Sequence, residues 1–192
     1  MSMDHTFIAS TVQGGTSDSW LELEKAWSPY HLTSDLVIPV GETMSVNDGV
    51  YLRVADEVTI TVQGTFNSGY STISSMGDGA RWGGLIVGED SETTVRVIGT
   101  SMVEGSPLIS IGGQSDIVLS HAHFARSSSA EPLLRSTSSA FMATLSIISS
   151  KFTDSASHCI ELQGSIELNI EDVETSNCNS DALWVQSSLL AI

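Results

Sequence analysis

The chain has 192 residues, 41% of them hydrophobic and 16% charged, which is enough for one domain with a continuous core. Its 23 acidic and 7 basic residues give a formal net charge of −16, which excludes nucleic acid and anionic membranes as partners, because their binders need clustered Lys and Arg. No stretch approaches the roughly 20 apolar residues of a membrane span, and the first residues, MSMDHTFIAS, show no export signal.

Residues 1–34 are predicted to form an irregular capping segment ahead of the main domain. Within it, SWLELEKAWSPY (19–30) is the only plausible helix of the chain. Ser28-Pro29 should end that helix, because the residue before a proline avoids the helical conformation. We expect this segment to cover the open first coil of the main domain.

The main domain is predicted over residues 35–192 as a single unit without linkers. Residues 35–66 hold four alternating apolar strands, separated by Val-Gly, Asn-Asp-Gly and Gln-Gly turns.

In the second half of the chain a template, apolar-x-apolar-x4-apolar, occurs four times. Its units begin at residues 95, 117, 145 and 166, so the starts lie 22, 28 and 21 residues apart. The units are Val95-Val97-Met102, Ile117-Leu119-Phe124, Leu145-Ile147-Phe152 and Ile166-Leu168-Val173. Further short apolar strands lie around them at 83–88, 107–113, 132–136, 158–164 and 181–186.

Repeats of this length are too short for a pair of helices with their turns, so they predict a solenoid of stacked strands. Period-two alternation buries one face of each strand, and Ser, Thr, Asn and Gly suit the polar corners. Equivalent residues of successive coils then become neighbours. We expect Ile117, Leu145 and Ile166 to form one interior column.

The segments DLVIPVGETMSVNDGVYLRV, ITVQGTF, RWGGLIV and SIISSKFTDS resemble the right-handed parallel β-helices of the pectin-lyase-like superfamily. The similarity covers roughly residues 28–187 and is closest to repetitive surface proteins of bacteria and archaea. It implies an all-β, right-handed parallel β-helix of about six to seven coils, with rungs about 4.8 Å apart. It also favours a packing role for Trp82 over stacking on a sugar ring.

Stacking also predicts two rows of polar residues along the outside of the solenoid. The first row holds Ser101, His123, Lys151 and Asp172, and the second holds Glu104, Arg126, Asp154 and Thr175. One interpretation is a solvated charge ladder that fixes the register of the coils. The other is a ligand-binding patch made of His123, Arg126, Lys151 and Asp154.

The resemblance also suggests an enzyme as the alternative. Relatives that cleave acidic polysaccharides use clustered carboxylates to bind Ca²⁺ and an Arg or Lys to remove a proton next to a carboxylate. The candidates here are Arg126, Lys151 and Asp154, but no acidic trio lies near Arg126 in sequence, and neither Asp-Asp nor Gly-His-Gly occurs. We therefore assign no catalytic residue and expect no cofactor, with Ca²⁺ required only under the enzyme alternative.

The two cysteines, Cys159 and Cys178, are too few for a metal site and are either free thiols or one disulfide. By the template, Cys178 corresponds to Ser157 of the previous coil, so stacking can bring the two sulfurs within bonding reach. A disulfide would indicate that the protein is located outside the cytoplasm. For His121-x-His123, a solvent-facing pair is favoured over a weak metal site, and we expect no metal.

These observations favour a non-catalytic extracellular or cell-surface β-helix module with a structural, adhesive or glycan-binding role and a polysaccharide as partner. The alternative is a polysaccharide lyase or glycoside hydrolase that acts on acidic glycans. Binding to ice or another crystal surface ranks last, because Thr59-x-Thr61 does not recur at the repeat period. The apolar end, LWVQSSLLAI, leads us to expect that a second copy covers this edge or that the natural protein, of which the chain would be a fragment, continues beyond residue 192.

Overall fold

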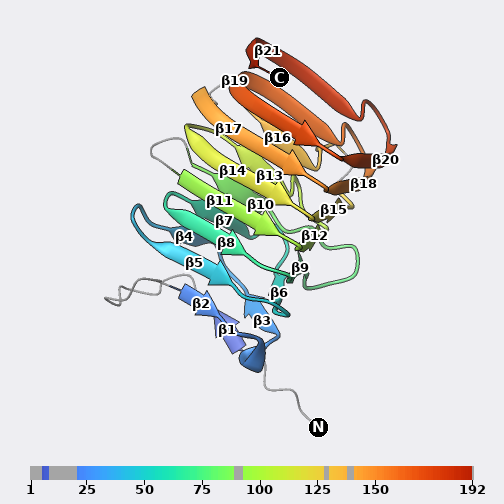
Figure 1. The fold of residues 1–192 in the computed structure, drawn as a ribbon. Coiled ribbons are helices and arrows are strands. Elements are labelled where there is room, and N and C mark those ends of the chain that lie inside the picture. Colours follow the sequence, from blue (N-terminus) through green and yellow to red (C-terminus); the bar gives the residue numbers. More distant parts are fainter. Residues whose placement is uncertain (1–5, 9–20, 89–92, 128–129, 138–140, 192) are drawn as a thin grey trace.

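The computed structural model describes residues 6–8, 21–88, 93–127, 130–137 and 141–191. In this part of the chain the protein is an all-β parallel solenoid of about seven turns without an α-helix, which confirms the predicted fold class (Figure 1). The strands form one 8-stranded and one 13-stranded sheet. The larger sheet consists of two stacks, so the solenoid has three faces, which we name stacks A, B and C.

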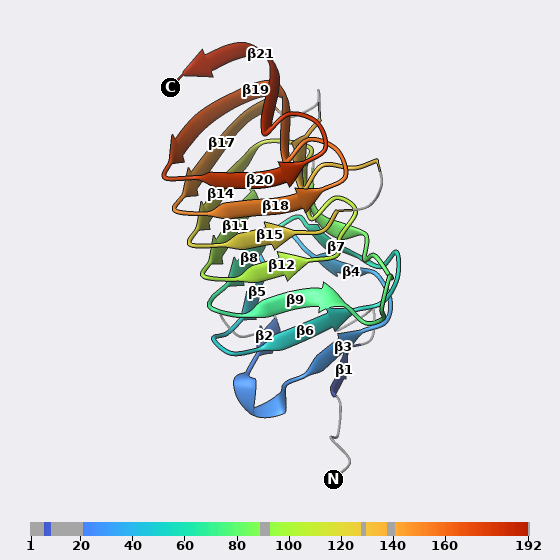
Figure 2. The ribbon, with the colours of Figure 1, turned by 90° about the vertical axis from the view of Figure 1, so that its right-hand side faces the viewer.

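Stack A is the 8-stranded sheet, and Figure 2 shows its strands one above another. Its strands are β1 (Thr6–Ile8), β3 (Tyr30–Leu32), β6 (Tyr51–Val54), β9 (Thr72–Ser75), β12 (Ser101–Val103), β15 (His123–Ala125), β18 (Lys151–Ser155) and β20 (Glu174–Cys178).

Stacks B and C make up the 13-stranded sheet. Stack B holds β4 (Leu36–Ile38), β7 (Thr59–Val62), β10 (Gly84–Val87), β13 (Ile109–Ile111) and β16 (Leu134–Ser136). Stack C holds β2 (Leu21–Leu23), β5 (Thr43–Val46), β8 (Thr65–Ser68), β11 (Thr93–Ile98), β14 (Ser115–Ser120) and β17 (Phe141–Ile148). The long strand β19 (Ile160–Glu171) pairs with β16 and with β17, so it joins the two stacks, and β21 (Leu183–Ala191) pairs with β19.

The core is a set of interior columns, one residue per coil. In β6, for example, Leu52 and Val54 are buried while Tyr51 and Arg53 are exposed, which is the alternation that the sequence predicted. Phe124 and Phe152 stack on successive rungs of stack A, with ring centroids 4.8 Å apart. Trp82 is fully buried and donates its indole N–H to the carbonyl oxygen of Val103 at 3.0 Å, so its packing role is confirmed.

The corners on either side of stack A differ in length. The C–A corner joins a strand of stack C to the next strand of stack A, and in the later coils it is two residues long, as in His121-Ala122 between β14 and β15. The A–B corner joins stack A to stack B and varies in length, from residues 33–35 between β3 and β4 to residues 76–83 between β9 and β10.

The helix predicted over 19–30 is wrong. Leu21–Leu23 is strand β2, which pairs with β5, and only Lys25–Trp27 forms a single 3₁₀ turn (η1). As part of this strand, Leu23 is buried in the core. A surface helix would bury this side chain less fully, so the strand gains more from the hydrophobic effect. Strands of the solenoid therefore already occur within residues 1–34.

The predicted interior column is right for two of its three members. Ile117 pairs with Leu145, but the next residue in that column is Leu168, and Ile166 pairs with Ala143 instead. Ile166, Leu168 and Ile170 of β19 alternate, so the strand itself fits two registers, and the prediction chose the wrong one because Val173 completes the template there, whereas polar Thr175 takes that place in the observed register. This shift of two residues also changes the last member of each predicted polar row.

Candidate functional site

The structure brings the four predicted patch residues together on the outside of the solenoid. His123 on β15 and Lys151 on β18 are neighbours in the parallel register of stack A. Arg126 and Asp154 lie where β15 and β18 turn into the A–B corner.

The polar groups of these residues form ion pairs and hydrogen bonds with side chains of the neighbouring coils, which together make a ladder along the solenoid. Arg126 forms an ion pair with Glu104 (Nη2 to Oε1, 3.2 Å), and Lys151 pairs with Glu174 (Nζ to Oε1, 2.7 Å). The remaining bonds link His123 Nε2 with Thr153 Oγ1 at 3.1 Å and Asp154 Oδ1 with the side-chain amide N–H of Asn177 at 2.9 Å. The row members predicted for the last coil, Asp172 and Thr175, are replaced by Glu174 and Asn177 because of the register shift.

Backbone geometry supports a structural role for the second row. Glu104, Arg126, Asp154 and Asn177 have φ values of 64°, 61°, 58° and 55°, so the same left-handed turn recurs on four rungs. The Arg126–Glu104 and Lys151–Glu174 pairs are partly exposed to solvent, and exposed pairs contribute only about 0–1 kcal/mol each. We therefore describe this patch as a register ladder.

The charges of the ladder affect one titratable group. Burial lowers the pKa of His123 below 6.5, and the positive charges of Lys151 and Arg126 lower it further, while Asp154 opposes them. The imidazole of His123 is therefore kept in its neutral form near pH 7.

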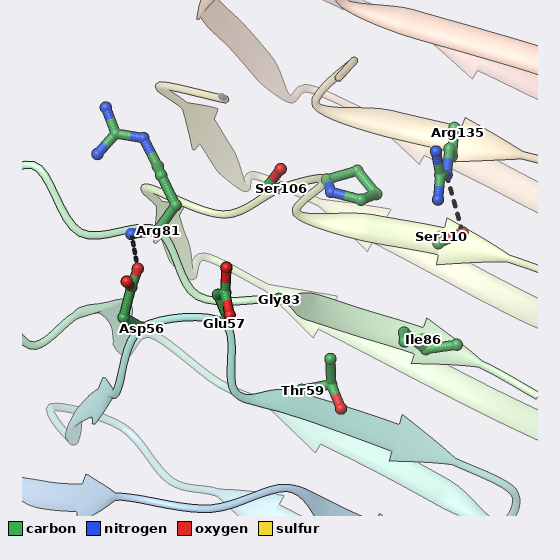
Figure 3. Close-up of a pocket in the computed structure, with 10 residues that line it drawn as sticks. Asp56, Glu57, Thr59, Arg81, Gly83, Ile86, Ser106, Ser110 and Arg135 are labelled. Carbon is green, nitrogen blue, oxygen red and sulfur yellow. Dashed lines mark hydrogen bonds between the residues drawn. The ribbon is translucent and has the colours of Figure 1, made fainter. Parts of the chain in front are cut away.

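A cleft of about 610 Å³ lies beside this ladder, where the A–B corner meets the outer face of stack B (Figure 3). Residues from four successive coils line it: Asp56, Glu57, Thr59, Arg81, Gly83, Ile86, Ser106, Pro107, Ser110 and Arg135. Its volume falls within the range of about 300–1,000 Å³ that is typical of small-ligand sites. Sequence reasoning missed this cleft.

Backbone hydrogen bonds fasten the two loops that carry the acidic and basic sides of the cleft. The N–H of Glu57 donates to the carbonyl of Arg81 at 2.9 Å, and the N–H of Arg81 donates to the carboxylate of Asp56 at 2.8 Å. The N–H of Gly83 then donates to the carbonyl of Val58 at 2.7 Å. Glu57 and Arg81 therefore sit on a preorganised part of the corner.

Glycine is required at residue 83 for this close approach. A Cβ atom there would lie 2.4 Å from the Thr59 methyl carbon and 2.7 Å from the carbonyl oxygen of Glu57, and the latter contact is with backbone that cannot move aside cheaply. The Gly83-Gly84 pair was a visible signal in the sequence, yet it was interpreted only as a strand start.

The polar groups of the cleft differ in how far the protein already satisfies them. Arg135 forms an ion pair with Glu131, and its Nε donates to the hydroxyl oxygen of Ser110 at 3.2 Å. Arg81 forms no ion pair with a described residue, and its guanidinium donates only to the carbonyl of the adjacent Ala80. Glu57 is exposed, and its carboxylate has no hydrogen-bond or ion-pair partner in the described part of the chain. In Figure 3, the Glu57 carboxylate points into the space between Arg81 and Ser106.

Cys159 and Cys178 form a disulfide that ties together the last two coils, with their Cα atoms 5.4 Å apart. His158, next to Cys159, stacks on Trp184 with ring centroids 5.8 Å apart and contacts Asp181.

Over the described ranges, no group of three or more His, Cys, Asp or Glu residues lies close enough together to hold a metal ion. The same ranges contain no helix that is long and apolar enough to cross a membrane.

A column of threonines on stack C was also missed. Thr43, Thr65 and Thr94 face outward in register on three successive coils, Asp116 takes the next place, and Thr144 follows it. Asp116 is paired with Arg96 at 3.2 Å, so an ion pair interrupts the array. The sequence-based argument against a threonine array rested on Thr59-x-Thr61, which lies on stack B.

A scan against models of protein families and searches of curated proteins and of solved structures returned no match to this chain.

Proposed function

We propose that this protein is a non-catalytic β-helix module of the cell surface or extracellular space that binds a glycan in the cleft of the A–B corner. We further propose that its coil is right-handed and that its fold belongs with the pectin-lyase-like superfamily, on the basis of the sequence resemblance. The observation that carries the glycan-binding role is the cleft, in which acidic, basic, hydroxyl and apolar groups converge on preorganised backbone.

Sugars suit this mixture of groups. Their hydroxyls both donate and accept hydrogen bonds, so they can use a carboxylate acceptor and a guanidinium donor together. The exposed side chain of Ile86 offers apolar surface to the C–H groups of a sugar ring. The predicted patch of His123, Arg126, Lys151 and Asp154 stays a weaker candidate, because its charges already serve neighbouring coils.

The disulfide supports the proposed location. Disulfides form and persist in oxidising compartments and are rare in the cytoplasm, and the Cys159–Cys178 bond closes the last turns of the solenoid.

A glycan array probed with the whole chain tests the proposed function. Binding to an oligosaccharide that Arg81→Ala weakens and Arg53→Ala leaves unchanged would support it. Arg53 is an exposed arginine on β6, outside the cleft, so it controls for the loss of one positive charge. No binding to any glycan, or equal loss in both variants, would overturn it.

The enzyme alternative has one observation in its favour, since the basic Arg81 and the acidic Asp56 and Glu57 line the same cleft. A lyase or hydrolase of acidic glycans needs a base and an acid in such a cleft. Turnover of polygalacturonate or another acidic polysaccharide that is lost in Arg81→Ala, Arg126→Ala or Lys151→Ala would establish this alternative, with Ca²⁺ added and withheld.

A further inference from the structure

Under the proposed function, the charges in the cleft decide which class of glycan it takes. Two carboxylates and two guanidinium groups line it. One of the guanidinium groups, that of Arg135, is already paired with the carboxylate of Glu131. What is left is a single positive charge, on Arg81, against the negative charges of Asp56 and Glu57, so the cleft itself offers no net attraction to an anion.

The rest of the molecule adds to this effect. The formal net charge of −16 repels any polyanion that approaches, and seven basic residues spread over the chain provide no compensating field. Of the basic residues on the outer faces, Arg96, Arg126 and Lys151 are paired with carboxylates.

We infer that the cleft binds uncharged hexose units of a neutral glycan, with the Glu57 carboxylate accepting hydrogen bonds from sugar hydroxyls and Arg81 donating to ring or hydroxyl oxygens. This inference rests on the proposed function and specifies its ligand. Glu57 carries it, because its carboxylate is exposed, points into the cleft and has no protein donor among the described residues. A carboxylate accepts from neutral hydroxyls in charge-assisted bonds but repels the carboxylate of a uronic acid.

The position of Glu57 adds to its suitability. Its φ of 60° is that of a left-handed turn, and its N–H is held by the carbonyl of Arg81 at 2.9 Å. The side chain therefore projects from backbone that is fixed before a ligand arrives, which lowers the entropic cost of binding.

The experiment compares matched pairs of oligosaccharides that differ only in whether C6 carries a hydroxymethyl or a carboxylate group, in the gluco, galacto and manno series. Binding of each pair to the whole chain is measured at low and high salt. We expect the neutral member of at least one pair to bind more tightly, with little salt dependence. We expect Glu57→Gln to weaken that binding by about tenfold or more, because a charge-assisted acceptor is lost.

The control variant is Glu171→Gln, which removes an exposed carboxylate at the end of β19, away from the cleft, and should leave binding unchanged. Tighter binding of the uronate members, strengthened by Glu57→Gln and weakened by salt, would overturn the inference while the glycan-binding function stands. Neutral binding that Glu57→Gln and Glu171→Gln affect equally would also overturn it. No binding to either member of any pair would overturn the proposed function itself.

Discussion

The C–A corner and the A–B corner of the same coils behave differently. The C–A corner of the last four coils is two residues long each time: Gly99-Thr100, His121-Ala122, Ser149-Ser150 and Asp172-Val173. The first residue of each pair has a positive φ, between 46° and 61°, and the second packs inward on the core or is buried. The A–B corner has no constant length, and it holds the cleft.

This difference shows that one corner of the solenoid sets the register of the coils, while the other is free to vary and can carry binding residues. A corner of fixed length transmits the register from stack C to stack A, so interior columns such as Phe124 and Phe152 stay aligned. The other corner can lengthen without disturbing the columns, because the next strand of stack B still finds its partner. Loops of this kind are the usual place for binding residues on a rigid scaffold.

The largest effect is expected from a one-residue insertion in each corner. A glycine inserted between Ser149 and Ser150 would shift β18 by one residue and turn Phe152 away from the core. Loss of that phenyl ring alone should lower the free energy of unfolding by about 3–5 kcal/mol. The matched insertion between the exposed residues Gly77 and Asp78 should cost less than about 1 kcal/mol.

Urea unfolding followed by circular dichroism measures both insertions. Equal destabilisation by the two would show that the C–A corner has no special role in setting the register.

The second prediction concerns the disulfide that joins Cys159, at the end of the A–B corner between β18 and β19, to Cys178, the last residue of β20, across 19 residues. Reduction, or Cys178→Ser, should lower the free energy of unfolding by about 3 kcal/mol, because the unfolded chain gains loop entropy. Thermal unfolding with and without reductant measures this effect. The double variant Cys159→Ser/Cys178→Ser should be insensitive to reductant, and a wild-type transition that reductant does not move would contradict the prediction.

The third prediction tests the inward residue of the C–A corner. Thr100 is fully buried, and its hydroxyl lies 2.9 Å from Ser68 Oγ and 3.1 Å from the carbonyl oxygen of Gly69. Thr100→Val should cost about 1–3 kcal/mol, since buried polar groups of the previous coil lose their partner. Thr94→Val, on the outer face of stack C, should change the urea midpoint little. Equal midpoints for the two variants would show that the buried hydroxyl contributes nothing.

The same two corners explain how far the sequence could predict the structure. Period-two alternation and a nearly constant spacing identified the solenoid. They correctly paired Ile117 with Leu145, because the C–A corner that follows each of these two strands has the same length and keeps the third apolar residue of the template at a fixed distance. The prediction was wrong at β19, where Ile166, Leu168 and Ile170 alternate and the nearby Val173 favours the wrong register.

The cleft could not be predicted, because its residues come from corners of unequal length. Glu57 lies in the A–B corner of one coil and Arg81 in that of the next, 24 positions later, while Arg135 lies on β16, two coils further on. No repeat template aligns these residues, and their contact depends on hydrogen bonds such as that between the Glu57 N–H and the Arg81 carbonyl. The ladder, by contrast, could be predicted, because Arg126 and Asp154 lie two residues after Phe124 and Phe152, the third apolar residues of their template units.

The smallest effect is expected from the ladder on stack A. Burial, and then Lys151 and Arg126, lower the pKa of His123 below 6.5 in the folded protein, against the opposing charge of Asp154. The unfolded chain therefore binds a proton more readily in the pH range just below 6.5, so stability contributed by His123 falls as the pH drops through that range and levels off above it.

Lys151→Met should raise the pKa of His123 towards 6.5 by removing the nearer positive charge, and it should flatten this part of the pH profile of stability. A titration of the His123 ring protons by NMR measures the pKa directly, and urea midpoints at acidic and neutral pH measure its effect on stability. Lys25→Met, in the 3₁₀ turn of the first coil, is the matched control and should leave both unchanged. If Lys151→Met left the His123 pKa where it was, the ladder would not act as an electrostatic unit, and the resemblance between its rungs would be one of backbone geometry alone.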